Sequence, residues 1–181
     1  MSRILWGVLA LVLAGSTAAV LYHHLHPSSG PLQRAHSEFS FTVHAPMAVA
    51  FPLFGPEGER PWAGHHWNPK FVFPTPAKDT EGAVFHVAHG HHDSTWVNTA
   101  FDPEHGHAAY VYIIDRKLAT RIDVQLTPAD AQTTTVRVMY ERTALSPSVN
   151  EDILEMAQTD PKMGLKWEQR IEKYLRERTS R

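Results

Sequence analysis

The chain of 181 residues contains no cysteine. This absence excludes disulfide bonds, thiol catalysis, thiolate metal ligands and lipid attachment through an N-terminal cysteine. The chain also has no large excess of positive or negative charge. It contains 17 Lys and Arg and 19 Asp and Glu, which gives a formal net charge of −2. No Lys/Arg stripe is present to neutralise phosphates, so the sequence does not support a nucleic-acid partner.

What is present is typical of a folded protein. Hydrophobic residues make up 43% of the chain and charged residues 20%, which is too apolar for a disordered chain. The length allows one domain with its own core plus an extension. The 13 histidines are unusual, and below about pH 6 they would make the protein cationic.

The N-terminus carries one long apolar run, from Ile4 to Tyr22, in which only Ser16 and Thr17 are polar. Two interpretations fit this hydrophobic helix: a cleaved secretory signal, or an uncleaved transmembrane anchor of about 20 residues. Arg3 is the nearest charge and places the rest of the chain outside the cytoplasm. We therefore expect a domain that is either anchored in the inner membrane facing the periplasm or secreted to the periplasm. The Pro-, Ser- and Gly-containing stretch 23–36 is expected to be a linker, and 37–178 the folded domain.

Strand patterns dominate that domain. Phe39, Phe41 and Val43 alternate with polar residues, which predicts a half-buried strand. Pro46 suits the first turn of a helix over 47–54, and a second short helix or turn is expected over 57–63. A short strand over 70–73 and five segments separated by turn residues follow, at 82–89, 95–101, 107–115, 118–127 and 132–143. This spacing predicts an antiparallel meander in which one face of the sheet is exposed to solvent.

The C-terminal region predicts the helix that covers the other face. Asn150 can cap it, and Asp160-Pro161 is expected to restart or kink it. An apolar stripe of four residues then recurs at helical spacing, namely Trp167, Ile171, Tyr174 and Leu175. The predicted class is α+β: a seven-stranded antiparallel sheet wrapped around a long C-terminal helix, with two short helices after the first strand. In such a helix-grip, the space between helix and sheet is too wide for side chains to fill.

A family resemblance rests on several strings in this order. They are FPLFGPEGERPWAGHHWNP (51–69), GAVF (82–85), TWV (95–97), TTVRV (134–138), YERTAL (140–145) and WEQRIEKYL (167–175). The chain resembles the START/Bet v 1-like superfamily, also called the SRPBCC or polyketide cyclase/dehydrase group, and within it a bacterial exported or membrane-anchored branch. The resemblance implies a cavity for a lipid-like or aromatic ligand. It implies no universal catalytic residue, because the superfamily uses one cavity for several purposes.

Candidate ligand-binding residues are mostly aromatic. Trp62 and Trp67 either line the cavity mouth or plug the end of the grip. His86 lies in the middle of a predicted strand, and it is either a polar group inside the cavity or a solvated surface residue. The same ambiguity of strand parity applies to Trp96. Three tyrosines are expected to supply polar hydroxyl groups to the pocket: Tyr110, Tyr112 and Tyr140.

Other polar residues are weaker candidates. Glu57 and Glu59 offer acid–base chemistry without an identifiable partner, so we expect them in the first turn of a helix, where they favour its dipole. His89, His91 and His92 offer metal ligands, but exposed histidines in a polar turn are the simpler interpretation. We therefore expect no metal and no cofactor.

Three functional hypotheses follow. The first is a non-enzymatic module, tethered to a membrane through Ile4 to Tyr22, that binds a small hydrophobic ligand. The second is a cyclase- or dehydratase-type enzyme with His86 as general base, which requires His86 inside the cavity. The third is an accessory subunit of a membrane complex, with the domain as its periplasmic cap.

Overall fold

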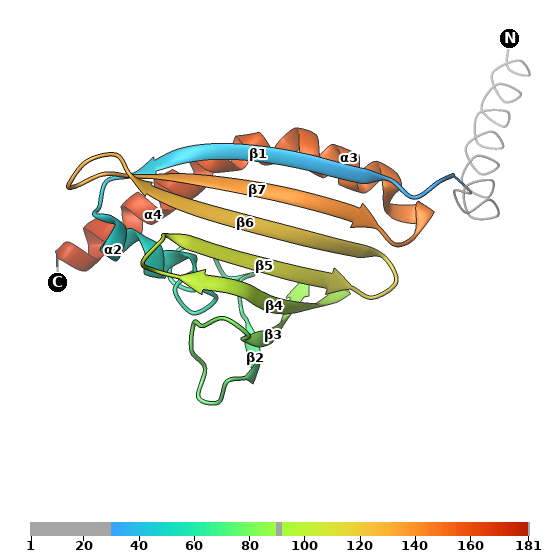
Figure 1. Cartoon of the computed structure of the whole chain (residues 1–181), viewed down its shortest axis with the longest axis horizontal. Helices are drawn as coiled ribbons and strands as arrows, with labels where there is room; N and C mark the ends of the chain where they lie inside the picture. The colour runs from blue at the N-terminus through green and yellow to red at the C-terminus, as the bar shows by residue number, and fades with distance from the viewer. Residues whose placement is uncertain (1–29, 90–91, 181) are drawn as a thin grey trace, which may run out of the picture.

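A computed structural model describes residues 30–89 and 92–180. Seven antiparallel strands form one sheet in the order β1-β7-β6-β5-β4-β3-β2 (Figure 1). The strands are β1 (Arg34–Val43), β2 (Lys70–Phe73), β3 (Val84–His89), β4 (His92–Asp102), β5 (His107–Ile114), β6 (Leu118–Pro128) and β7 (Thr134–Ala144). The helices are α2 (Met47–Ala50), η1 (Phe51–Phe54), η2 (Pro147–Val149), α3 (Asn150–Thr159), η3 (Asp160–Lys162) and α4 (Met163–Thr179).

The strands are half-buried because apolar and polar residues alternate along them. In β1, every second residue from Ala35 to Val43 is buried, and the residues between them are mostly exposed. Its partner β7 repeats this pattern, and Phe39 lies opposite Val138 in the register. One face of the sheet therefore packs on the core and the other faces solvent.

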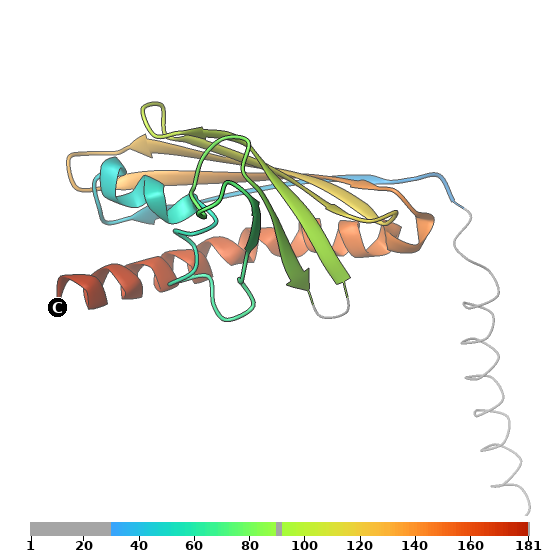
Figure 2. The same ribbon diagram turned by 90° about the horizontal axis from the view of Figure 1, so that it is seen from below.

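The C-terminal helices cover the inner face of the sheet. Figure 2 shows α3 and α4 running along the sheet as a nearly continuous rod, with the sheet curving over α4. The 3₁₀ turn η3 joins them, because Pro161 cannot continue the hydrogen bonding of the preceding helix. Ile171 of α4 is completely buried, and Gly164 allows the helix to approach Phe39 closely.

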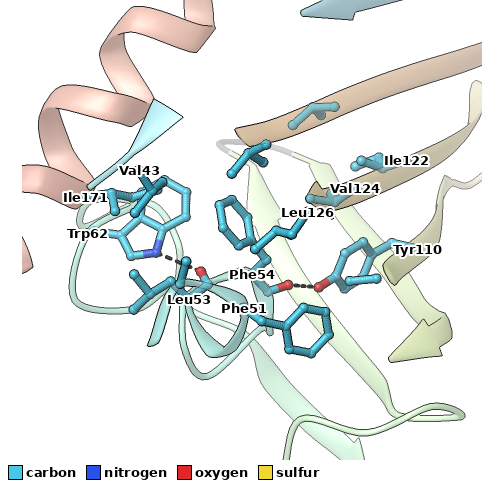
Figure 3. Close-up of a cluster of buried hydrophobic side chains, with 14 of the residues drawn as sticks. Val43, Phe51, Leu53, Phe54, Trp62, Tyr110, Ile122, Val124, Leu126 and Ile171 are labelled. Atoms are coloured by element: carbon cyan, nitrogen blue, oxygen red, sulfur yellow. Dashed lines mark hydrogen bonds between the residues drawn. The ribbon is translucent and has the colours of Figure 1, made fainter. Parts of the chain in front are cut away.

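The segment after β1 closes one end of the grip. Phe51, Leu53 and Phe54 of η1 are buried and pack with Trp62 against the sheet (Figure 3). Residues 56–62 form successive hydrogen-bonded turns, among them Glu59 N–H to Gly55 O at 2.8 Å. Two glycines make this path possible: a Cβ at Gly58 would collide with the Pro52 carbonyl, and one at Gly55 with the Asp79 carboxylate.

The predicted fold class is confirmed, with small differences in boundaries. The first strand begins at Arg34, within the stretch 23–36 that was expected to be a linker. The region 57–63 forms turns, which was one of its two expected conformations. The predicted apolar helix from Ile4 to Tyr22 lies outside the described residues. Among residues 30–89 and 92–180, no helix is long and apolar enough to span a membrane.

Candidate functional site

A cavity of about 310 Å³ lies between α4, the turns after η1 and the inner face of the sheet. Trp96, Tyr110, Ile122 and Tyr140 line it from β4, β5, β6 and β7, and Trp167 lines it from α4. The rest of the wall comes from Glu59, Trp62, Ala63, His66, Trp67, Tyr112, Val124, Arg142, Met163 and Arg170. His66 and Arg170 are exposed, so the cavity reaches solvent on their side.

Aromatic rings form most of the cavity wall. Four of the five tryptophans of the chain line it, and they contact one another in two groups. Trp62 and Trp167 meet edge to face with ring centroids 5.4 Å apart. Trp67 meets Trp96 at 5.3 Å, and Trp96 stacks on Tyr112 at 4.4 Å. Such interlocked rings make a rigid wall, because each ring limits the rotamers of its neighbours.

Several polar atoms of these rings are used within the protein. The indole N–H groups of Trp62 and Trp67 donate to the carbonyl oxygens of Leu53 and Pro56, at 2.8 and 2.9 Å. The Trp96 N–H donates to the hydroxyl of Ser94 at 2.7 Å. The Tyr110 hydroxyl donates to the Phe54 carbonyl (Figure 3). These bonds hold the turns and η1 against the sheet and direct the apolar parts of the rings toward the cavity.

Four polar side chains of the wall remain without such a bond. Within residues 30–89 and 92–180, the structure gives no side-chain hydrogen bond to Glu59, His66, Tyr112 or Tyr140. All four residues line the cavity. They are therefore the groups through which the wall can make polar contacts with a bound molecule.

The turn that precedes Glu59 is held in place by Asp79, and this positions Glu59 at the cavity. The carboxylate of Asp79 accepts the backbone N–H groups of Glu57 and Gly58 at 2.8 and 3.0 Å. Glu57 meanwhile forms an ion pair with Arg60, N–O distance 2.7 Å, outside the cavity lining. The expectation that Glu57 and Glu59 serve a helix dipole was wrong for Glu59, since turns replace the helix and its side chain lines the cavity.

The environment of Glu59 favours its neutral form. Burial in the apolar wall raises the pKa of Glu59 to about 8, and the Asp79 carboxylate raises this pKa further. Burial also raises the pKa of Asp79 itself. Near neutral pH, Glu59 can thus donate a hydrogen bond or a proton, and after losing the proton it can accept one.

Two tyrosines of the cavity, Tyr110 and Tyr140, are held as neutral phenols. Burial raises the pKa of Tyr110 well above its usual value, and the carboxyl groups of Glu59 and Asp79 act in the same direction. Burial likewise raises the pKa of Tyr140, with Asp160 and Glu59 adding to the effect. The hydroxyl of Tyr140 is therefore a hydrogen-bond donor at any physiological pH.

The guanidinium of Arg142 is neutralised inside the wall. It is 5% exposed and forms a bidentate pair with Asp160, which also accepts the hydroxyl of Ser37. Its Cζ lies 4.5 Å from the centroid of the Tyr140 ring. The network ties η3 to β1 and β7, and its positive charge is compensated locally.

The structure places most of the predicted site residues together. The residues that it brings into the cavity wall are Trp62, Trp67, Trp96, Tyr110, Tyr112 and Tyr140. That these residues bind a ligand stays a prediction. His86 is the exception: it is exposed on the outer face, 3.2 Å from the Thr95 hydroxyl, because its neighbours Phe85 and Val87 face inward. The hypothesis of His86 as a general base inside the cavity was therefore wrong.

The metal candidates are not tested. His89 and His92 face each other in the β3–β4 register, but their side chains and His91 lie outside the described residues. Among the described residues, no group of three or more His, Asp or Glu is arranged to hold a metal ion.

Sequence reasoning missed Glu59 and Arg142 as wall residues. For Arg142 a signal was available, because it shares strand parity with Val136, Val138 and Tyr140. For Glu59 the signal was weaker: the two glycines of Gly55-Pro56-Glu57-Gly58-Glu59 indicate a tight turn rather than a helix.

Comparisons with known proteins agree on the fold. No protein-family model matches the chain, and no curated protein matches its sequence. Solved structures do match. Norcoclaurine synthase from Thalictrum flavum, in complex with dopamine and hydroxybenzaldehyde, aligns with a TM-score of 0.59 and 12% identity, over 81% of this chain and 88% of that one.

Two further structures extend the set. Ara h 8.0201 aligns with a TM-score of 0.59 and 15% identity, over 78% of this chain and 97% of that one. The Zhui aromatase/cyclase from Streptomyces sp. R1128 aligns with a TM-score of 0.54 and 15% identity, over 79% and 96%. The chain therefore has the helix-grip fold of the START/Bet v 1-like superfamily. At these identities the likeness shows the fold alone.

Proposed function

We propose that this domain binds a small, mainly apolar molecule in the cavity between α4 and the sheet. The observation that carries the proposal is the wall itself: four tryptophans and three tyrosines around about 310 Å³, with only a few polar groups left to contact a ligand. Ligand pockets are typically apolar and concave, with a small number of placed polar groups. The proteins of similar fold include an aromatase/cyclase and a synthase complexed with aromatic compounds.

The size of the cavity narrows the class of ligand. A volume of about 310 Å³ is at the lower end of the range for small-molecule sites. It suits a compound of one to three rings better than a lipid with two acyl chains. The many aromatic faces favour a flat ring, which can stack on them.

A calorimetric titration of the full chain with 2-naphthol tests this proposal. Ile122→Phe adds volume inside the cavity, whereas Ile113→Phe makes the same change at an exposed position of β5. We expect 2-naphthol to bind the natural protein and the Ile113→Phe control alike, and Ile122→Phe to bind at least about tenfold more weakly. Absence of binding to the natural protein, or equal binding by both variants, would contradict the proposal.

A second candidate function is proton-transfer catalysis by Glu59. The specific observation is a carboxyl group with a pKa near neutrality in an apolar wall, the property that a general acid–base residue requires. Glu59 would take the α-proton of an enolisable aromatic ketone and return a proton from solvent to the same carbon. In D₂O the protein should then speed deuterium exchange at C2 of 1-tetralone, followed by NMR, and Glu59→Gln should abolish the acceleration. Equal rates with the two proteins would exclude this role.

We also propose that Ile4 to Tyr22 tethers the domain to a membrane on the periplasmic side, which would allow it to serve as an accessory subunit of a membrane complex. The support is the length of the apolar run and the single charge at Arg3. N-terminal sequencing of protein recovered from membranes should find Ser2 or Met1 at the start. A mature soluble protein that begins near Val20 would contradict tethering.

A further inference from the structure

We infer that the molecule bound in this cavity carries a basic nitrogen: an aromatic compound with a protonated amine, whose cation pairs with Glu59 among the indole and phenol rings. This inference deepens the proposed binding function and depends on it. It rests on the distribution of charge around the cavity, which differs between its two sides.

The terminal nitrogens of the two guanidinium groups in the wall are already engaged. Those of Arg142 pair with Asp160 through two N–O contacts, one at 3.2 Å, and the group stacks on Tyr140, while its buried Nε has no hydrogen-bond partner among residues 30–89 and 92–180. Arg170 is exposed, and its guanidinium donates to the Ala63 carbonyl at 2.9 Å. An anionic ligand would therefore have to compete with Asp160 or with the Ala63 carbonyl to form a bidentate pair with either guanidinium.

The negative side of the wall is not compensated in this way. Glu59 lines the cavity, and within the described residues its carboxyl has no hydrogen-bond or ion-pair partner. Asp79 lies directly behind it and accepts two backbone N–H groups. Two neighbouring carboxyl groups favour a positive charge at the cavity surface, because either one gains from the proximity of a cation.

The aromatic rings act in the same direction. The faces of Trp and Tyr rings are electronegative and attract an ammonium group, most strongly where water is excluded. Trp62, Trp67, Trp96 and Trp167 all lie in the wall with Glu59. A carboxylate beside several indoles is the combination expected of a site for an organic cation, and the rest of the apolar wall accommodates the ring system.

Proton release gives a specific signature of this arrangement. Burial and Asp79 hold Glu59 largely protonated at pH 7, while a simple alkylamine in solution is also protonated. A complex with one ammonium–carboxylate pair retains one proton of these two, so the other passes to the buffer. The other titratable and charged residues of the cavity wall are Tyr110, Tyr112, Tyr140, Arg142, Arg170 and His66, and Asp79 acts on Glu59 from outside the lining.

The test uses three probes that share one ring: 2-(2-naphthyl)ethylamine, 2-(2-naphthyl)ethanol and 3-(2-naphthyl)propanoic acid. Calorimetry of the full chain at pH 7, repeated in two buffers of different ionisation enthalpy, gives the affinity and the protons released. We expect the amine to bind at least about tenfold more tightly than the alcohol, with the acid weakest. Binding of the amine should release most of one proton, and binding of the alcohol none.

Two variants locate the effect. Glu59→Gln keeps the size of the side chain and should bring the amine to the affinity of the alcohol, without proton release. Glu57→Gln, two residues earlier and outside the lining, should leave the preference intact. Should Glu59→Gln fail to fold, the proton release of the natural protein still decides the question.

The outcomes separate this inference from the proposed function. Equal affinities for amine and alcohol, tighter binding of the acid, or amine binding without proton release would overturn the amine inference while leaving a binding domain. Failure of all three probes to bind would contradict both.

Discussion

Glu59 is the residue whose position says most about the cavity. Its backbone is fixed by the turn that Asp79 holds, and its half-buried side chain lines a mainly apolar cavity. Keeping a carboxyl group there costs stability when the group is ionised. A group retained at such a cost is a candidate for a functional role, which we propose is contact with a ligand.

The pKa of Glu59 predicts how stability depends on pH. The folded protein binds a proton at Glu59 up to about pH 8, whereas the unfolded chain loses it near pH 4.5. Between these values the folded state holds more protons, so the free energy of unfolding falls as pH rises and levels off above pH 8. Urea unfolding from pH 5 to 9 should show a loss of roughly 2–4 kcal/mol across this window.

The variant Glu59→Gln should remove most of that slope and be more stable than the natural protein at pH 8.5. Glu57→Gln is the matched control, because its ion pair with Arg60 is at the surface, and it should keep the slope. A natural protein whose stability is unchanged between pH 5 and 8 would show that Glu59 is solvated and ionised.

The joint between α3 and α4 is the element on which the shape of the grip depends most. Asp160 begins η3 and is buried, and it binds both Arg142 of β7 and Ser37 of β1. These contacts set where the helical rod meets the sheet. The start of α4 then brings Met163 and Trp167 to the cavity.

Asp160→Asn should therefore be strongly destabilising. It removes the charge that compensates Arg142, which is 5% exposed and cannot reach water. The expected loss in the free energy of unfolding is about 3–5 kcal/mol, measured by urea denaturation. Asp115→Asn, at an exposed turn where Asp115 contacts Arg116, should cost about 1 kcal/mol or less. Equal losses in the two variants would mean that the buried pair contributes nothing beyond a surface pair.

The local sequence was sufficient to predict the break between the two helices, but not the contacts that its residues make. Asp160-Pro161 indicates an interruption of a helix from sequence alone. Asp160 binds Arg142 of β7, 18 residues away, and Ser37 of β1, 123 residues away, and no local pattern specifies either contact. The same holds for Glu59 and Asp79, which are 20 residues apart and meet only because both adjoin the same turn.

Across the whole molecule, the class of fold could be predicted from the sequence. The residues that line the cavity could be predicted only in part. Period-two alternation and turn spacing predict seven strands, and the six from β2 to β7 follow one another as a meander, whereas β1 pairs with β7 at the far end of the chain. Tyr110, Tyr112 and Tyr140 were correctly expected in the wall, whereas the sequence left the side of Trp96 open. The side of the sheet on which His86 lies could not be predicted from the sequence. The alternation in this strand gives two sets of residues, and both contain apolar side chains: Val84, His86 and Ala88, or Phe85 and Val87. Strand parity alone therefore cannot say which set faces the cavity.

The central claim is that the space between α4 and the sheet is a binding site rather than a loosely packed core. A crystal of the protein soaked with 6-bromo-2-naphthol tests it most directly, because the anomalous signal of bromine locates the compound. We predict a bromine peak inside the cavity, among Trp62, Tyr112 and Trp167. A peak only on the outer face near His86, or an undisturbed cavity at saturating compound, would contradict the account.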